Sequence, residues 1–221
     1  MQTGSVDVLH CTFTCNRAEG PQGDGGALRV SDANIEACYF QDNSAEFGGG
    51  AMQSSGDVTM TNCVLYSNGA FSGGSLYIPG GTTTVSNCTL WLNGAAFYDI
   101  DIGAGNMTMS NSIVWPSDDF VVTSGADICY SLIEGGYAGD GNISDVPQFV
   151  NAPDDLRLAP GAPGIDAGRN HAVADDSFDL DGDGDTAEPT PFDFDGAPRF
   201  VDDPAVVDTG LDGNGYAEIV D

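Results

Sequence analysis

Positive charge is scarce in this chain. The 221 residues include only five Lys and Arg, against 34 Asp and Glu, which gives a formal net charge of −29 at pH 7. This imbalance all but excludes binding to nucleic acid or to an anionic bilayer through a basic patch. The natural ligands of such a surface are cations.

Long apolar runs are also missing. No stretch approaches the length of a transmembrane helix, and residues 1–20 lack the basic and apolar regions of a secretory signal. We therefore expect no direct insertion into a membrane. Met1 leads almost at once into Val6 and Val8 in strand register, so we expect the natural protein to begin earlier. A hydrophobic content of 41% is enough for a core, which argues against disorder.

What the sequence does contain is a repeat of about 25 residues. Four cysteines recur at steps of 27, 25 and 25 residues, and apolar residues three positions before and two positions after them keep the same register. The cysteine column comprises Cys11, Cys38, Cys63, Cys88 and Ser112. The two apolar columns comprise Val8, Ile35, Met60, Val85 and Met109, and Phe13, Phe40, Leu65, Leu90 and Val114. A fixed period of this kind predicts a solenoid.

Each repeat reads as a short apolar strand that ends in asparagine, followed by a second strand that begins at paired glycines. The asparagines are Asn16, Asn43, Asn68 and Asn93, and the glycine pairs begin at Gly25, Gly49 and Gly73. Brief apolar runs between Gly, Asn and Ser favour an all-β parallel β-helix over helical repeats. Five coils stacked at about 4.8 Å would make a rod on the order of 24 Å long. Aligned asparagine amides would hydrogen-bond along it, and the glycines would allow turns with positive φ.

The cysteine column leaves three interpretations open. Stacked free thiols are favoured because Ser112 shares the column, so the cysteines behave as small side chains that fill a layer. Disulfides between neighbouring coils are the second interpretation. A metal site is the third, although zinc needs ligands that converge on one point and a column points them in parallel. Cys15 and Cys129 lie outside the column.

The repeats resemble those of polymorphic outer membrane proteins, which are found in bacterial surface adhesins. Phe13-Thr14-Cys15-Asn16 and Phe40-Gln41-Asp42-Asn43 resemble the FxxN element, and Gly25-Gly26-Ala27-Leu28 resembles the GGA[ILV] element. The second half resembles the end of bacterial right-handed β-helix surface proteins of the choice-of-anchor type, with motifs in the same order at 111–115, 130–137, 147–150, 156–158, 162–168, 193–199 and 218–221. The resemblance implies a right-handed β-helix of about five coils that is exported to the cell surface. It implies no reaction.

The fourth coil departs from the repeat. Phe97-Tyr98-Asp99-Ile100 stands where two glycines, a small residue and an apolar residue stood before. We expect a different turn there, with a carboxylate at a position that is otherwise small.

One acidic segment has the clearest chemistry. Asp179, Asp181 and Asp183 supply carboxylates at positions 1, 3 and 5, and Gly184 follows at position 6, as at the start of an EF-hand-like calcium loop. Position 12 is Thr190 in place of the bidentate Glu, so another carboxylate or water must close the site. The predicted calcium ligands are Asp179, Asp181, Asp183, Asp185 and Asp193, and Glu188 and Asp195 are further closing candidates. A solvated acidic loop is the alternative. The segment 212–218 is a weaker second calcium candidate.

Two other function classes stay open. A polysaccharide hydrolase would need convergent carboxylates, for which Asp99, Asp101 and the pair Asp118-Asp119 are candidates, and a lyase would need a base opposite an acidic cluster. A sugar-binding module without catalysis would need an outward aromatic platform. The aromatic candidates are Tyr66, Tyr77, Trp91, Phe97 and Tyr98.

The favoured prediction is a two-part, non-catalytic surface module. Residues 1–145 form the β-helix repeats, and residues 146–221 form a loop-rich C-terminal cap that covers the exposed edge of the last coil. Asp166 would bond backbone amides there. The module would be secreted or attached to the cell surface, have a structural or adhesive role, and be stabilised by calcium. Glycans or surface proteins of a host or neighbouring cell are its expected partners.

Overall fold

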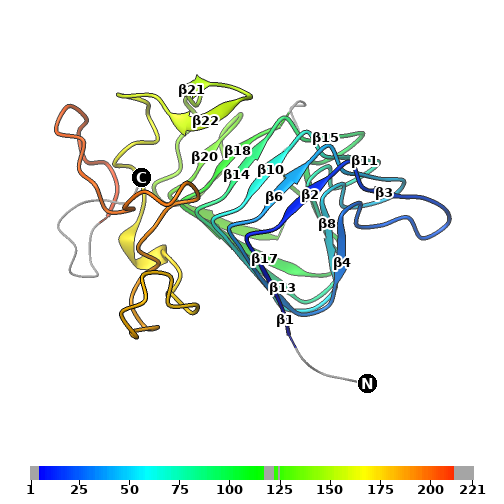
Figure 1. Ribbon diagram of the computed structural model, residues 1–221. Coiled ribbons are helices and arrows are strands. Elements are labelled where there is room, and N and C mark those ends of the chain that lie inside the picture. Colours follow the sequence, from blue (N-terminus) through cyan, green and yellow to red (C-terminus); the bar gives the residue numbers. More distant parts are fainter. Residues whose placement is uncertain (1–4, 117–121, 124, 212–221) are drawn as a thin grey trace.

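The chain forms a parallel β-solenoid with a C-terminal segment packed against it (Figure 1). The computed structural model describes residues 5–116, 122–123 and 125–211. Sheet A consists of β1 (Val6–Leu9), β5 (Ala33–Glu36), β9 (Val58–Thr61), β13 (Thr82–Ser86), β17 (Asn106–Ser110) and β19 (Ala126–Cys129). Sheet B consists of β2 (Thr12–Thr14), β6 (Tyr39–Gln41), β10 (Val64–Tyr66), β14 (Thr89–Trp91), β18 (Ile113–Trp115) and β20 (Leu132–Ile133).

Two shorter sheets complete each turn of the solenoid. Sheet C consists of β3 (Arg17–Ala18), β7 (Ser44–Ala45), β11 (Gly69–Ala70) and β15 (Gly94–Ala95). Sheet D consists of β4 (Leu28–Val30), β8 (Met52–Ser54), β12 (Leu76–Ile78) and β16 (Ile100–Ile102). Four coils therefore carry all four strands. A fifth contributes β17 and β18 and returns through a parallel bridge between Ile100 and Val122, and β19 and β20 begin a sixth, so the number of coils is close to the predicted five.

The predicted apolar columns are confirmed. Ile35, Met60, Val85 and Met109 pair in register along sheet A, and Phe40, Leu65, Leu90 and Val114 pair along sheet B. These residues are buried, and together with Met52, Leu76 and Ile100 of sheet D they fill the interior of the solenoid. The solenoid strands lie within residues 6–133, which we call the rod. Because identical positions stack at the interstrand spacing, each column repeats one side-chain shape along the core.

The first strand of each repeat was predicted as one continuous strand, and that prediction is wrong. The residue before the cysteine column adopts a positive φ, at His10, Ala37, Asn62, Asn87 and Asn111. A left-handed residue ends a strand and changes the chain direction, so the segment divides into one strand of sheet A and one of sheet B. Each coil thus contains four strands in place of the predicted two.

The cysteine column is a row of free thiols. All six cysteines are unpaired, and the column extends from Cys11 to Ser131. The backbone N–H of Cys63 donates to Sγ of Cys88 at 3.3 Å, and the N–H of Cys88 donates to Oγ of Ser112 at 3.2 Å. Thiol and hydroxyl groups therefore accept the amide hydrogens that the bend would otherwise leave unpaired. The structure favours the stacked-thiol interpretation over the disulfide and metal interpretations.

The predicted asparagine ladder is confirmed. Oδ1 of Asn68 accepts the backbone N–H and the side-chain Nδ2–H of Asn43, at 3.1 and 2.9 Å. Its own Nδ2 donates to the Phe40 carbonyl and to Oδ1 of Asn93, at 2.9 and 3.0 Å. Each buried amide thus bonds to the coils on both sides, which joins neighbouring coils at the bend between sheets B and C.

The turn into sheet D changes in the fourth coil, as predicted. Gly25, Gly49 and Gly73 have positive φ, but Phe97 does not. Asp99 stands in the column of Ala51 and Ser75, is only 2% exposed, and accepts the Ser75 backbone N–H at 2.8 Å through Oδ1.

The last coil and the C-terminal segment differ from the prediction of a terminal cap. The edge beyond β20 is met by residues 140–143, since Ile133 N–H donates to the Ile143 carbonyl and Tyr130 N–H to the Asp140 carbonyl. The C-terminal segment, defined here as residues 146–211, lies along the outside of the bend between sheets A and B (Figure 1). It contains an antiparallel pair, β21 (Phe149–Asn151) and β22 (Asp155–Leu158), and a 3₁₀ helix, η1 (Asn170–Ala172).

Candidate functional site

A short antiparallel bridge joins the two ends of the acidic loop that is predicted to bind calcium. Asp175 bridges Pro189, Asp176 N–H donates to the Glu188 carbonyl at 2.7 Å, and Thr190 N–H donates to the Ala174 carbonyl at 2.8 Å. The two ends of the loop are therefore held side by side, and residues 177–187 form the turn between them.

Three of the predicted ligands converge. Asp179, Asp181 and Asp183 each offer a carboxylate oxygen, and these oxygens lie within 4.8 Å of one another. Oδ1 of Asp179 also accepts the Gly184 N–H at 3.0 Å, and Oδ1 of Asp181 accepts the Asp183 N–H at 3.1 Å. The 1, 3, 5 spacing thus brings the first three carboxylates together.

The other two predicted ligands do not join this group. Oδ1 of Asp185 accepts the Ala187 N–H at 3.0 Å in the loop itself. Asp193 lies outside the loop, where its Oδ1 accepts the Ala197 N–H at 2.8 Å and the residue lines a cleft.

A second carboxylate group was not anticipated from the sequence. Oxygens of Asp176, Asp181 and Glu188 also lie within 4.8 Å of one another. Asp176 precedes the 1, 3, 5 motif, and the backbone bridge brings it beside Glu188. The acidic pair Asp175-Asp176 can be seen in the sequence, but the 1, 3, 5 spacing of the calcium-loop motif does not include it.

The environment of this group favours a cation. Loss of hydration, and then the carboxylates of Asp183, Asp181, Asp185 and Asp176, raise the pKa of Glu188 above its ordinary value. Like charges in a confined space disfavour the ionised form unless a cation compensates them. Carboxylate oxygens are ligands that Ca²⁺ prefers, so the donor set fits the ion implied by the sequence.

A third group of acids comprises Asp166, Asp202 and Asp208, of which Asp166 has a structural role. Asp166 is buried, its Oδ2 accepts the Asp203 N–H at 3.3 Å, and its carbonyl accepts the N–H groups of Thr209 and Gly210. The predicted role of Asp166 in bonding backbone amides is confirmed. The second predicted calcium segment, 212–218, lies outside the described residues.

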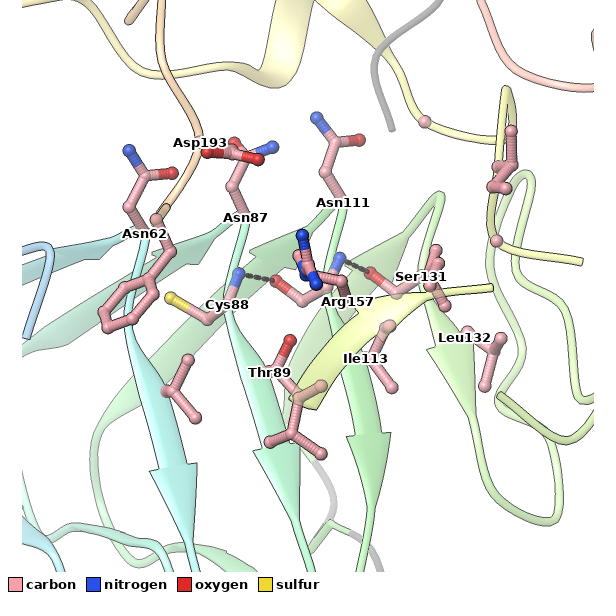
Figure 2. Close-up of a pocket in the computed structure, with 18 of the residues that line it drawn as sticks. Asn62, Asn87, Cys88, Thr89, Asn111, Ile113, Ser131, Leu132, Arg157 and Asp193 are labelled. Carbon is pink, nitrogen blue, oxygen red and sulfur yellow. Dashed lines mark hydrogen bonds between the residues drawn. The ribbon is translucent and has the colours of Figure 1, made fainter. Parts of the chain in front are cut away.

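A cleft of about 760 Å³ separates the C-terminal segment from the rod. Asn62, Asn87 and Asn111 lie in a row along it in the view of Figure 2. Oδ1 of Asn111 accepts the Arg169 backbone N–H at 2.8 Å, and Nδ2 of Asn111 donates to the Arg169 carbonyl at 3.0 Å. The Nδ2 and Oδ1 atoms of Asn87 are buried and have no hydrogen-bond partner.

Asn62 belongs to the main polar contact between the rod and the C-terminal segment. Arg199 is 4% exposed and donates through Nη2 to Oδ1 of Asn62 and to the Phe192 carbonyl, and through Nε to the Thr190 carbonyl at 3.2 Å. Burial lowers the pKa of Arg199 to about 10. Burial, with a smaller contribution from Asp176, raises the pKa of nearby Glu36 to about 7, although Arg199 opposes this shift.

Apolar contacts support the same interface. Phe149 packs edge-on against Trp91 of sheet B at 4.9 Å, and Phe194 packs against Tyr39 at 6.2 Å. Tyr66 and Trp91, two members of the predicted aromatic platform, pair in register on this sheet. They therefore lie on a different side of the rod from the other candidates.

A row of exposed phenylalanines follows the turns between sheets C and D. Phe47, Phe71 and Phe97 are 45%, 56% and 51% exposed, and the rings of Phe71 and Phe97 meet edge to face at 5.0 Å. Beside Phe47 and Phe71, a groove of about 300 Å³ is also lined by Asp24, Tyr77 and Asp101. A Cβ on Gly48 would come within 2.6 Å of the Tyr77 ring, so glycine is needed there for the ring to lie against the backbone.

The predicted hydrolase carboxylates are not arranged as a pair. Asp99 is buried, whereas Asp101 is partly exposed and accepts a hydrogen bond from Oγ of Ser72 at 2.6 Å. Asp118-Asp119 lie outside the described residues.

Comparison with known proteins identifies the class. The family described as the right handed beta helix region matches residues 1–126, and the chain belongs to this family. No curated protein and no solved structure matches the chain. Among the described residues, no helix has the length and apolar character needed to cross a membrane.

Proposed function

We propose that this right-handed β-helix is a secreted or cell-surface module with a structural and adhesive role. The observation that carries the proposal is the row of Phe47, Phe71 and Phe97. Contiguous exposed apolar side chains mark interaction surfaces on soluble proteins. Asp24 and Asp101 in the adjoining groove, within a chain of net charge −29, favour a protein partner that combines apolar and basic side chains.

Binding to a peptide array that varies in basic and apolar content tests this proposal. We expect wild-type protein to bind basic, apolar peptides, and a Phe47→Ser/Phe71→Ser/Phe97→Ser variant to bind them roughly ten-fold more weakly or worse. Val146→Ser/Val150→Ser, which changes two exposed apolar residues of the C-terminal segment, is the matched control and should bind normally. Equal binding by the phenylalanine variant would contradict the adhesive role of the row.

Calcium stabilisation of the C-terminal segment is part of the same proposal. The convergence of Asp179, Asp181 and Asp183 supports it. At a calcium concentration about 100 times Kd, ligand binding stabilises the folded state by about 2.7 kcal/mol, which should raise Tm by roughly 5 to 10 °C. A thermal melt in EDTA against excess calcium, at matched ionic strength, should show this rise. Asp181→Ala/Asp183→Ala should abolish this rise. A wild-type Tm that calcium does not change would refute calcium stabilisation.

A sugar-binding module is the second candidate, favoured by Asn87. Its amide holds one unpaired donor group and one unpaired acceptor behind the wall of the cleft, a combination that suits sugar hydroxyls once the atoms covering the amide move aside. Calorimetric titration with neutral oligosaccharides should then show binding that Asn87→Ala removes. Absence of heat with wild-type protein would count against this candidate. The polysaccharide-degrading version would further require convergent carboxylates.

A further inference from the structure

We propose that the cation in the C-terminal segment is held by Asp176, Asp181 and Glu188, at the base of the acidic loop. This inference rests on the proposed calcium stabilisation and assigns its ligands. Two of the three residues lie outside positions 1, 3 and 5 of the loop motif.

Asp176 is the buried member of the three ligands. The residue is 0% exposed, and its Oδ2 accepts the Leu180 N–H at 2.8 Å. Its Oδ1 is buried without a hydrogen-bond partner. A buried carboxylate oxygen that has lost its water and gained no partner is destabilising, and a bound cation removes that cost.

Glu188 lies on the opposite side of the bridge from Asp176. Like Oδ1 of Asp176, Oε1 of Glu188 is buried without a hydrogen-bond partner. The N–H of Asp176 donates to the Glu188 carbonyl, so the two residues are held together by the backbone before any ion binds. Asp181 reaches the same point from the turn of the loop.

The two motif carboxylates outside this group, Asp179 and Asp183, lie in a different environment. Asp183 is exposed, and its Oδ1 already accepts the Asp185 N–H at 2.7 Å. Oδ1 of Asp179 accepts the Gly184 N–H. These residues satisfy turn amides in contact with solvent, so they gain less from a cation than Asp176 and Glu188 do.

The ligand class is a hard divalent cation, and calcium suits it better than magnesium. Three carboxylates from a bridge and a flexible turn make an irregular oxygen cage, which Ca²⁺ accepts with six to eight ligands, whereas Mg²⁺ demands near-ideal octahedral geometry. Water can supply the remaining positions.

The site also has a direct connection to the rod. Thr190, which belongs to the same bridge, accepts a hydrogen bond from Arg199, and Arg199 bonds Asn62 in the rod. A cation that fixes the bridge would therefore fix the Arg199 contact as well. Calcium should tighten the association of the C-terminal segment with the rod.

Calorimetric titration of the full chain with calcium tests the assignment, using Asp176→Asn, Glu188→Gln, Asp183→Asn and Asp185→Asn. Each variant removes one negative charge, so general electrostatics is matched. Asp176→Asn and Glu188→Gln should weaken calcium binding by more than about ten-fold, and Asp185→Asn, the control, by less than about three-fold. Melting in EDTA checks folding: Asp176→Asn should melt no lower than wild type, because it removes repulsion and keeps the acceptor for Leu180.

The calcium affinities of wild type and of the variants distinguish a site at the bridge from a site in the motif loop. If calcium binds wild type and Asp176→Asn equally while Asp183→Asn loses binding, the ion lies in the motif loop, and the present assignment is overturned while calcium stabilisation stands. If calcium does not bind wild-type protein, both fail. Equal affinity for magnesium would overturn the choice of ion.

Discussion

The rod and the C-terminal segment satisfy their polar groups in opposite ways. In the rod, a residue bonds its counterpart one coil away, as Asn43 bonds Asn68 and the N–H of Cys63 bonds Cys88. In the C-terminal segment, partners are particular to each place, as where Arg199 bonds Asn62. Of the 34 acidic residues, 18 lie at positions 146–221, where such repetition is missing. Repetition lets the rod stabilise itself, whereas the C-terminal segment depends on a few buried polar contacts and, in our proposal, on a cation.

The largest expected effect comes from breaking the repetition in the rod. Asn68→Ala removes four hydrogen bonds and leaves the buried N–H of Asn43 unpaired. We expect unfolding free energy to fall by about 4 kcal/mol in urea denaturation. Asn16→Ala at the exposed start of the ladder is the control, with a loss of about 1 kcal/mol or less. Equal losses at both positions would show that stacking inside the ladder contributes nothing extra.

Breaking the contact between the two regions should have a smaller effect. Arg199→Met fills a similar volume but removes all three hydrogen bonds of the guanidinium group, and should destabilise the interface by about 3 kcal/mol. We expect limited proteolysis to cleave the C-terminal segment first and to leave the rod intact. Arg157→Met, at an exposed ion pair with Asp155, is the control and should leave the cleavage rate unchanged. Simultaneous loss of both regions would mean that they fold as one cooperative unit.

Asp99 is a buried acid of the rod, so its ionisation makes the stability of the rod depend on pH. Burial raises its pKa to about 7, against two opposing hydrogen bonds from Ser75. In the unfolded chain Asp99 ionises near pH 4, so stability falls as pH rises from about 4 to about 7. Asp99→Asn should remove the contribution of Asp99 to this fall. From pH 4 to pH 8 the stability of the variant relative to wild type should therefore rise by roughly 4 kcal/mol, while the cost of the buried amide N–H lowers the variant by the same amount at both pH values. A constant difference across this pH range would contradict the raised pKa.

The smallest effect on stability should come from replacing one residue of the cysteine column with another residue type that the column already contains. Cys63→Ser places a hydroxyl where Ser112 and Ser131 already accept amide hydrogens farther along the rod. We expect a loss of about 1 kcal/mol or less, measured by thermal melting with and without reductant. A large loss, or a Tm of wild type that drops with reductant, would indicate a disulfide in place of stacked thiols.

The same contrast explains what could be predicted from the sequence. The core columns and the asparagine ladder were predictable because stacking turns spatial neighbours into a fixed period. The left-handed bend was not, since His10, Ala37 and Asn62 share no residue type. Asp176 was missed because a bridge with no repeat places it beside Glu188. The sequence does not show which aromatic candidates stay uncovered, because the period of the repeat does not indicate which outer face of the rod the C-terminal segment covers.

Hydrogen exchange of the full chain, measured residue by residue in EDTA and in saturating calcium, tests whether the C-terminal segment needs a cation that the rod does not need. We expect ladder amides such as those of Asn43 and Asn68 to stay protected in both conditions, and the amides of Asp176 and Thr190 to become protected only with calcium. Equal protection of the two regions in EDTA, or a loss of ladder protection when calcium is removed, would contradict this expectation.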